Sequence, residues 1–294
     1  MSTEPPAPEG QVPLAYRNEK FLNSPDARAL RIISEYLEPL AHFRRERIRD
    51  TVVFFGSARI EENGPLGRYY RDARTLARII TEWSGSLQDP TRRFVVCSGG
   101  GPGIMEAANR GAKDAGGKTI GLNIGLPMEQ LPNPYITPQL GFQFHYFFMR
   151  KFWFAYLAKA MVAFPGGFGT LDELLEILTL TQTQKLNKKI IIVLYGTQFW
   201  HEVINFDALL RHGTISKSDL ELFQFADDPE SAFRILESEL TKYYLRPEAP
   251  LPEPLRVDPD IATSKVADPP QEATPPPPGR RPVSGDASEE SGES

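Results

Sequence analysis

The chain has 294 residues, of which 40% are hydrophobic and 24% are charged, so it is long enough to bury a substantial core. Its net charge of -5 argues against a long basic surface for nucleic acid or an anionic membrane. Its first residues lack the pattern of a secretion signal and no long uncharged apolar run occurs, so we expect neither secretion nor membrane spanning. Cys97 is the only cysteine, which excludes an intrachain disulfide and favours a reducing, cytoplasmic location.

The two ends differ in composition from the middle. Residues 1–20 are polar and Pro-rich, and residues 246–294 combine repeated prolines with an acidic, Ser-rich finish, so we expect two disordered tails. The tract Pro275 to Pro278 also matches a ligand for a proline-recognising domain. Residues 21–245 are expected to form one domain.

Between the tails, short apolar runs alternate with helical patterns. In chain order they predict helix 26–48, strand 51–55, helix 67–83, strand 94–97, helix 102–115, strand 118–124, helix 142–159, strand 161–164, helix 171–184, strand 189–195, helix 199–210 and helical residues 218–244. Because Ile190 to Leu194 is typical of a strand buried on both faces, we expect helices on both sides of a parallel sheet. The predicted fold is a doubly wound, Rossmann-like α/β sandwich.

Three glycine-bearing turns follow predicted strands: Gly56 to Ala58, Ser98 to Gly103 and Pro165 to Thr170. Ligands of doubly wound sheets bind beyond the carboxyl ends of the strands. A single turn of this kind is usually loop chemistry, but three at equivalent positions predict a polar crevice of nucleotide size.

The third turn lies in the most informative stretch, Phe164 to Glu173, where an apolar run ends in glycines and a helical pattern follows at once. Glycines let backbone N–H groups converge without Cβ obstruction, and the positive end of the helix favours an anion. The stretch therefore predicts a phosphate site with a carboxylate, Glu173, at its rim.

Other nucleotide and metal motifs fail. The dinucleotide pattern Gly-x-Gly-x-x-Gly requires a third glycine, but that position holds Ile104 in the second turn and Asp172 in the third. NAD binding is therefore not indicated. None of the four histidines stands at metal-ligand spacing from another histidine or from the cysteine. We expect no cofactor and no metal.

The glycine turns resemble those of the LOG, or "lonely guy", family of cytokinin riboside 5'-monophosphate phosphoribohydrolases, over about residues 51–196. The family pattern Pro-Gly-Gly-x-Gly-Thr-x-x-Glu is met in full by Pro165 to Glu173, and the Arg-Lys pair that precedes it is met by Arg150-Lys151. The run Gly99 to Ala107 is similar to the longer branch of the family. Members are often labelled lysine decarboxylases, although nothing in these motifs identifies a pyridoxal phosphate-binding lysine.

The resemblance implies a homodimeric or larger enzyme that hydrolyses the N-glycosidic bond of a nucleoside 5'-monophosphate to free base and ribose 5-phosphate. It implies that Arg150 and Glu173 are catalytic. The residues it implies for substrate binding are Ser57, Gly99, Gly100, Gly101, Gly103, Glu129, Lys151, Gly166, Gly167, Phe168, Gly169 and Thr170. Residues 21–245 would then be a Rossmann-like catalytic domain.

The sequence departs from the short plant-like members at the base pocket. Phe147-Phe148 stand where those members carry Met-His, and Asp172 stands where many have glutamate. The preferred base therefore stays open between cytokinin-type, purine and pyrimidine.

Three alternatives stay open from the residues themselves. Thr170 and Glu173 also match a capping box, in which the glutamate bonds back to the start of its helix. The fold also suits a nucleotide-binding or sensor protein without catalysis. A scaffold that acts through its Pro-rich tail is the third.

Overall fold

The computed structural model describes residues 14–89, 91–125 and 131–245. Glu129 and most of both predicted tails lie outside these described residues. Helical turns at Ala15–Arg17 and Glu19–Leu22 (α1) occupy the described part of the predicted N-terminal tail. The domain boundaries at residues 20 and 246 stay predictions.

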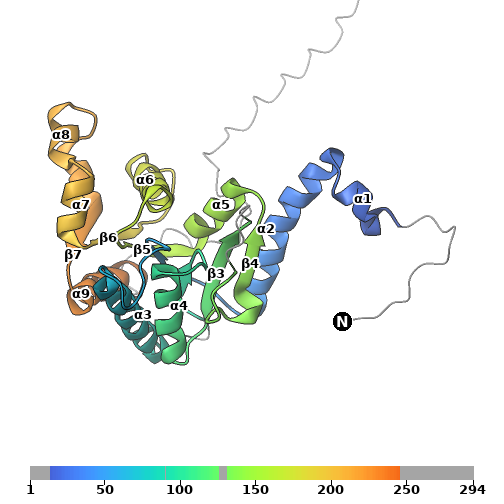
Figure 1. The fold of residues 1–294 in the computed structure, drawn as a ribbon, viewed down its shortest axis with the longest axis horizontal. Helices are drawn as coiled ribbons and strands as arrows, with labels where there is room; N and C mark the ends of the chain where they lie inside the picture. Colours follow the sequence, from blue (N-terminus) through green and yellow to red (C-terminus); the bar gives the residue numbers. More distant parts are fainter. Residues whose placement is uncertain (1–13, 90, 126–130, 246–294) are drawn as a thin grey trace, which may run out of the picture. The chain divides into compact units, whose positions relative to one another are not determined.

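Within the described residues, seven parallel strands form one sheet in the order β4-β3-β2-β1-β5-β6-β7. The strands are β1 (Thr51–Phe55), β2 (Val95–Ser98), β3 (Thr119–Ile124), β4 (Gly141–Phe144), β5 (Ala158–Ala163), β6 (Ile191–Tyr195) and β7 (Phe223–Ala226). The chain runs outward from β1 to β4 and then returns to place β5 beside β1 (Figure 1). The topological switch point therefore lies between β1 and β5, and the predicted doubly wound fold is confirmed.

Helices cover both faces of this sheet. They are α2 (Arg28–Arg45), α3 (Gly67–Ser86), α4 (Ile104–Asp114), α5 (Phe147–Leu157), α6 (Phe168–Gln182), α7 (Thr197–Val203), α8 (Phe206–Arg211) and α9 (Pro229–Leu240). Figure 1 shows α3, α4 and α9 on one face and α5 and α6 on the other. Helix α2 packs on the same side as α5.

Alternating side chains of each strand feed two separate cores. On β1, Val52 and Phe54 point into the core formed with α3, α4 and α9, whereas Val53 and Phe55 point into the core formed with α2, α5 and α6. All five residues of β1 are buried. This burial on both faces explains why the strand sequences are nearly continuous apolar runs.

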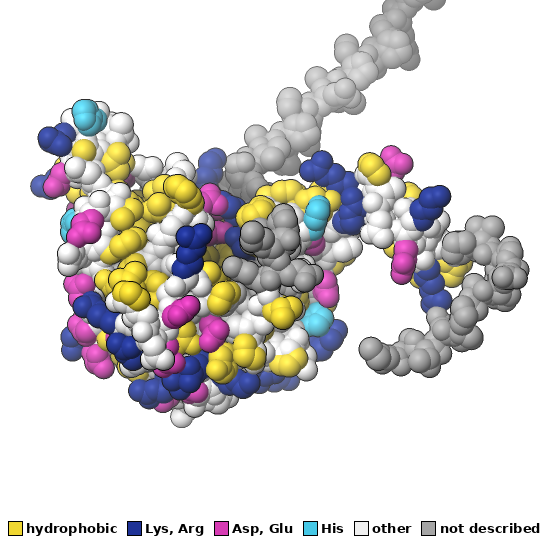
Figure 2. All heavy atoms as spheres, viewed as in Figure 1, with side chains coloured by type: hydrophobic (Ala, Val, Ile, Leu, Met, Phe, Trp, Pro, Cys, Tyr) yellow, Lys and Arg dark blue, Asp and Glu magenta, His cyan; other side chains and the backbone are white. Residues whose placement is uncertain are grey.

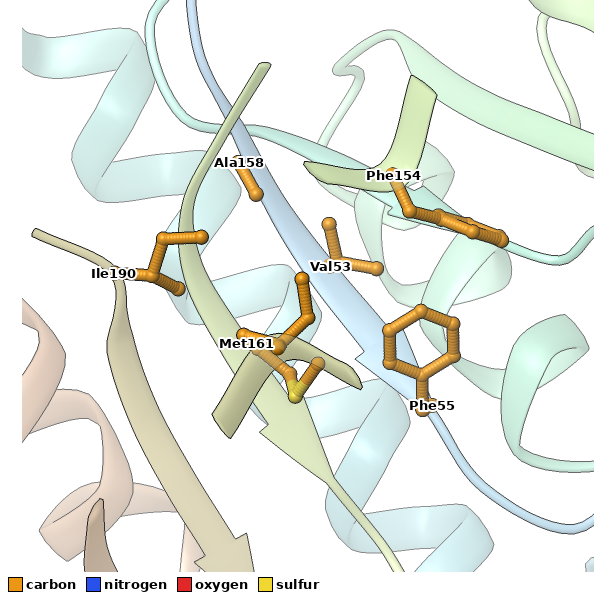
Figure 3. A pocket seen from close by; sticks show the side chains of 7 residues that line it. Val53, Phe55, Phe154, Ala158, Met161 and Ile190 are labelled. Carbon is orange, nitrogen blue, oxygen red and sulfur yellow. The ribbon is translucent and has the colours of Figure 1, made fainter. Parts of the chain in front are cut away.

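The second of these cores contains a small packing gap beneath the sheet (Figure 3). It is lined by seven apolar side chains: Val53, Phe55, Phe154, Ala158, Met161, Ile177 and Ile190. The gap has no room for the centre of a water-sized sphere. It is therefore a packing feature and not a ligand site.

Three predicted elements were wrong in their extent. Predicted helix 142–159 contains strand Gly141–Phe144, helix Phe147–Leu157 and the start of β5 at Ala158. In β4 buried and exposed residues alternate, which is the period of a strand that is open on one face. The dense aromatic composition of the run concealed this change of period.

The other two errors concern the C-terminal third. Predicted helix 199–210 is two helices, because the side chain of Asn205 accepts from Ala208 N at 2.8 Å and caps a new start. Predicted helical residues 218–244 contain β7 at Phe223–Ala226 before Asp228 caps α9. Among the described residues, no helix has the length and apolar character that crossing a bilayer requires.

Candidate active site

The three glycine turns meet at the carboxyl edge of the sheet. Ser57 N donates to Pro165 O at 3.0 Å, and Ile104 N donates to Ser57 O at 3.1 Å. The turn after β1 is therefore bonded to the turn after β5 on one side and to the start of α4 on the other. This confirms that the turns lie together, as their positions after parallel strands predicted.

Glycine is required where these turns touch. A Cβ on Gly103, whose φ is +69°, would lie 2.3 Å from Ser57 O. A Cβ on Gly56 would lie 2.7 Å from the side chain of Ile104. Any larger residue would separate the turns, so these glycines allow the turns to pack together.

Helix α6 begins with an open amino end. It starts at Phe168 with Gly167 as N-cap, and no side chain caps its first turn. Gly167, Phe168 and Gly169 are exposed, so the first N–H groups of a 15-residue helix face solvent. A Cβ on Gly166 would lie 2.1 Å from Thr170 Oγ1, which ties the turn closely to the helix.

The capping-box alternative for Glu173 is wrong. Because the helix begins two residues before Thr170, that threonine is the third helical residue and not the N-cap. The Glu173 carboxylate instead accepts from Arg150 Nη2 at 3.0 Å. Thr170 and Glu173 share one buried face of α6, three residues apart.

Arg150 reaches Glu173 from the neighbouring helix α5. Its guanidinium lies over the rings of Phe147, at 5.3 Å, and Phe154, at 5.5 Å. Its Nε is buried and has no hydrogen-bond partner among the described residues. The pair therefore joins α5 to α6 while the arginine keeps an unused donor.

Burial dominates the electrostatics of Glu173. The side chain is 5% exposed, and its desolvation raises the pKa to about 7, although Arg150 and Lys151 act in the opposite direction. A carboxyl group that titrates near neutral pH and lies against a cation can take up or release a proton during a reaction.

Lys151 has other partners. Its Nζ contacts Asp172 Oδ2 at 2.8 Å and Glu176 Oε2 at 3.0 Å, along the surface of α6. Burial lowers the pKa of Lys151, but these two carboxylates outweigh it and the net shift is upward. The structure thus gives Lys151 a bridging role between helices, and its predicted contact with substrate stays a prediction.

The structure describes all the predicted site residues of the first two turns, but it does not describe Glu129. Ser57 Oγ accepts from Arg59 N at 3.1 Å, so its hydroxyl closes a local turn. Gly99, Gly100, Gly101 and Gly103 lie in the second turn, beside the first. Glu129 lies outside the described residues.

Sequence reasoning missed the asparagines behind the second turn. Asn123 and Asn133 are 7% and 6% exposed and face the carbonyl groups of Gly99 to Gly101. A signal was available: Asn123 is a polar residue in an otherwise apolar strand, and Asn133 stands between two prolines.

Large apolar side chains are exposed around the open end of α6. Phe168 is 92% exposed, and Phe147, Phe148 and Leu175 are each 50% exposed. Figure 2 shows hydrophobic side chains gathered over α6. Such a patch on a surface marks a place for a ligand or another chain.

Fold and site together define the class: a Rossmann-like α/β protein with an uncapped helix start beside the switch point of its sheet. The family model described as "Possible lysine decarboxylase" matches residues 105–236. These residues include the Arg150-Lys151 pair and the turn before α6.

Curated proteins of one family are similar to this chain. The chain is 30% identical over 177 residues to cytokinin riboside 5'-monophosphate phosphoribohydrolase LOG of Oryza sativa subsp. japonica, covering 59% of this chain and 66% of that protein. It is 25% identical over 202 residues to cytokinin riboside 5'-monophosphate phosphoribohydrolase LOG2 of Arabidopsis thaliana, covering 68% of this chain and 87% of that protein. The match thus spans just under two thirds of the rice protein. The chain is therefore similar to proteins of the LOG family, which is the resemblance that its motifs indicated.

Solved structures show a more distant likeness. The X-ray structure of TM1055 is 23% identical with a TM-score of 0.46, covering 64% of this chain and 99% of that one. The Moco carrier protein from Chlamydomonas reinhardtii is 21% identical with a TM-score of 0.44, covering 66% and 99%. At these scores the two structures carry no argument about this chain.

Proposed function

We propose that this protein hydrolyses the N-glycosidic bond of a nucleoside 5'-monophosphate and releases the free base and ribose 5-phosphate. The observation that carries the proposal is the buried Arg150–Glu173 pair, with its 3.0 Å contact, one turn beyond the uncapped start of α6. The start of α6 suits an anion, and the Glu173 carboxylate suits a developing cation.

The 5'-phosphate would bind at the start of α6. The N–H groups of Phe168, Gly169 and Thr170 belong to the first turn, where the helix offers unsatisfied donors and positive charge. Binding there fixes the ribose with respect to Glu173. The reacting groups are then held in position, which lowers the entropic part of the barrier to hydrolysis.

Bond cleavage then places positive charge on the ribose. Water adds to C1', the C1'–N bond breaks, and its electron pair leaves with the base, which takes up a proton. The ionised Glu173 carboxylate either accepts the proton of the attacking water or stabilises the oxocarbenium character of the sugar. Arg150 stays charged and directs donors toward the same region.

The base would lie against the aromatic start of α5. The half-exposed rings of Phe147 and Phe148 offer flat apolar surface to a planar base. The relatives are named for cytokinin riboside 5'-monophosphates. Because this chain has Phe147-Phe148 where short plant-like members have Met-His, we include ordinary purine and pyrimidine monophosphates as candidate substrates.

The test is direct. The purified protein is incubated with AMP, CMP and isopentenyl-adenosine monophosphate, and free base and ribose 5-phosphate are quantified. We expect the two products in equal amounts. Glu173→Gln keeps the size of the side chain and an oxygen for Arg150, so release should disappear while nucleotide binding persists. Binding without release from any nucleotide in the wild-type protein would support a sensor and overturn the hydrolase.

We also propose that the protein works as a homodimer. The exposed apolar side chains at Phe148, Phe168 and Leu175 support this, since a second chain would remove them from water. Light scattering on the size-exclusion peak measures the mass. A mass of one chain at micromolar concentration would contradict the proposal.

A further inference from the structure

The glycine turn after β2 is held from behind by side-chain amides. Asn133 Nδ2 donates to Gly100 O and Gly101 O, both at 3.1 Å, and its backbone N–H donates to Gly100 O at 2.8 Å. Asn123, with its amide nitrogen toward the turn, donates to Gly99 O and Gly100 O, both at 3.2 Å. Every carbonyl from Gly99 to Gly101 therefore accepts from one of two asparagines.

The turn fits these amides closely. Gly100 has a φ of +73°, and a Cβ there would lie 2.4 Å from the nearest atom of the Asn123 side-chain amide. Only glycine combines this backbone conformation with such close approach. The two asparagines are almost completely buried, so water does not compete for their hydrogen bonds.

A further asparagine supports the arrangement from below. Asn109 Oδ1 accepts from Asn133 at 2.9 Å and from Ser98 Oγ at 2.7 Å, and Asn109 Nδ2 donates to Thr119 Oγ1. Ser98 Oγ in turn accepts from Gly100 N at 3.0 Å. The network joins α4, β2, β3 and the segment after residue 131 without any charged group.

We propose that Asn133 and Asn123 are positioning residues for nucleotide binding. By drawing the carbonyl oxygens of Gly99 to Gly101 into the protein, they keep the negative ends of these peptide groups away from the crevice. The crevice then presents N–H groups to an anionic substrate. This inference rests on the proposed function, because the turn matters for catalysis only if a nucleotide binds beside it.

Asn133→Ala tests the inference against Thr119→Val as a matched control. Both remove hydrogen bonds from one buried network, but Thr119 contacts only Asn109 within it and makes no bond to the turn. Asn133→Ala should raise KM for the preferred nucleotide about tenfold and change kcat less than about threefold. Thr119→Val should lower Tm by about as much as Asn133→Ala does, but it should leave KM within about twofold of the wild-type value.

Hydrogen exchange gives a second readout that does not need turnover. The amides of Gly99 to Gly103 should exchange faster in Asn133→Ala than in the wild-type protein, and at the wild-type rate in Thr119→Val. If Asn133→Ala does not fold, Asn123→Ala replaces it with the same expectations.

The outcomes separate the two claims. Equal changes of KM in Asn133→Ala and Thr119→Val, or unchanged exchange of the turn in Asn133→Ala, would overturn the positioning role. If the wild-type protein releases no base from any nucleotide, the proposed function fails, and the exchange measurement alone then decides whether the asparagines order the turn.

Discussion

Two buried arginine–carboxylate pairs lie at opposite edges of the same parallel sheet. Arg93 and Asp50 stand before β2 and β1, at the amino edge, whereas Arg150 and Glu173 stand near the carboxyl edge, on α5 and α6. Arg93, Asp50 and Glu173 are almost completely removed from water, and the side chain of Arg150 is 14% exposed. They differ in how many of their hydrogen-bonding groups are used.

The pair at the amino edge is saturated. Arg93 bonds to Asp50, to Asp89 Oδ2 at 3.3 Å and to Tyr244 O at 3.3 Å, and it lies over the ring of Phe94. Lys159 Nζ adds a second cation 3.6 Å from Asp50. Each of the three guanidinium nitrogens of Arg93 thus has an acceptor in the protein, which is the arrangement of a structural ion pair.

The pair at the carboxyl edge is left open. Arg150 makes one charge contact, to Glu173, and its buried Nε has no partner among the described residues. Burial raises the pKa of Glu173 by more than Arg150 and Lys151 lower it. Buried charge that the fold does not fully satisfy is a mark of a functional site.

The largest effect is expected from Glu173→Gln. Loss of the carboxylate removes the proton acceptor and the charge that stabilises the ribose cation, so kcat should fall about 10³-fold. The same assay on Glu82→Gln, which changes an exposed carboxylate paired with Arg78, should give wild-type rates. Turnover within tenfold of wild type in Glu173→Gln would remove Glu173 from the mechanism.

The saturated pair should respond in stability and not in chemistry. Asp50→Asn leaves Arg93 and Lys159 without their shared carboxylate, so unfolding free energy should fall by about 3 kcal/mol. Urea titration measures this change, and Glu82→Gln, in an exposed pair, should cost less than about 1 kcal/mol. Wild-type stability in Asp50→Asn would show that the amino-edge pair does not hold the fold.

The phosphate turn should tolerate no side chain. In Gly166→Ala the new Cβ would lie 2.1 Å from Thr170 Oγ1, so the turn must shift and KM should rise about tenfold. Gly85→Ala in α3 is the control, because no atom lies within 4 Å of its Cβ. Unchanged nucleotide KM in Gly166→Ala would argue that phosphate binds elsewhere.

A pH profile tests the open pair alone. The pKa of Glu173 is raised from its ordinary value of 4.5 to about 7, so the carboxylate form increases as pH rises through neutrality. We expect kcat/KM to rise on the acid side and to level off above about pH 8. Nucleotide binding to Glu173→Gln over the same range corrects for titration of the substrate phosphate. A profile that is flat down to pH 5 would contradict the raised pKa.

The smallest effect should come from the C-terminal tail. Its composition predicts no packed core, so removal of residues 246–294 should leave kcat/KM within about twofold of the full chain. Loss of turnover in the shortened protein would show that the tail belongs to the catalytic unit.

Most of the fold was accessible from the sequence, because buried parallel strands are apolar runs and glycine-bearing turns follow several of them. The aromatic run from Phe142 to Lys159 was the main failure, since strand β4 and helix α5 share the same composition there. Local spacing could not choose between two roles for Glu173. The position where α6 starts and the contact with Arg150, which is 23 residues away in sequence, exclude the capping role.

The role of the supporting asparagines could not be predicted for a related reason. Asn109, Asn123 and Asn133 come from a helix, a strand and a loop, and no single segment shows which groups their amides bond. Asn123 and Asn133 bond to the turn at Gly99 to Gly101, Asn109 bonds to Asn133, and these contacts form only when the segments are assembled.

The most direct test of this account measures base release per folded molecule in Glu173→Gln and Asp50→Asn side by side, with the best nucleotide of the panel. The account predicts that Glu173→Gln is folded and inactive, whereas Asp50→Asn is less stable and releases base at the wild-type rate. Activity retained in Glu173→Gln, or lost in folded Asp50→Asn, would contradict the assignment of chemistry to the open pair.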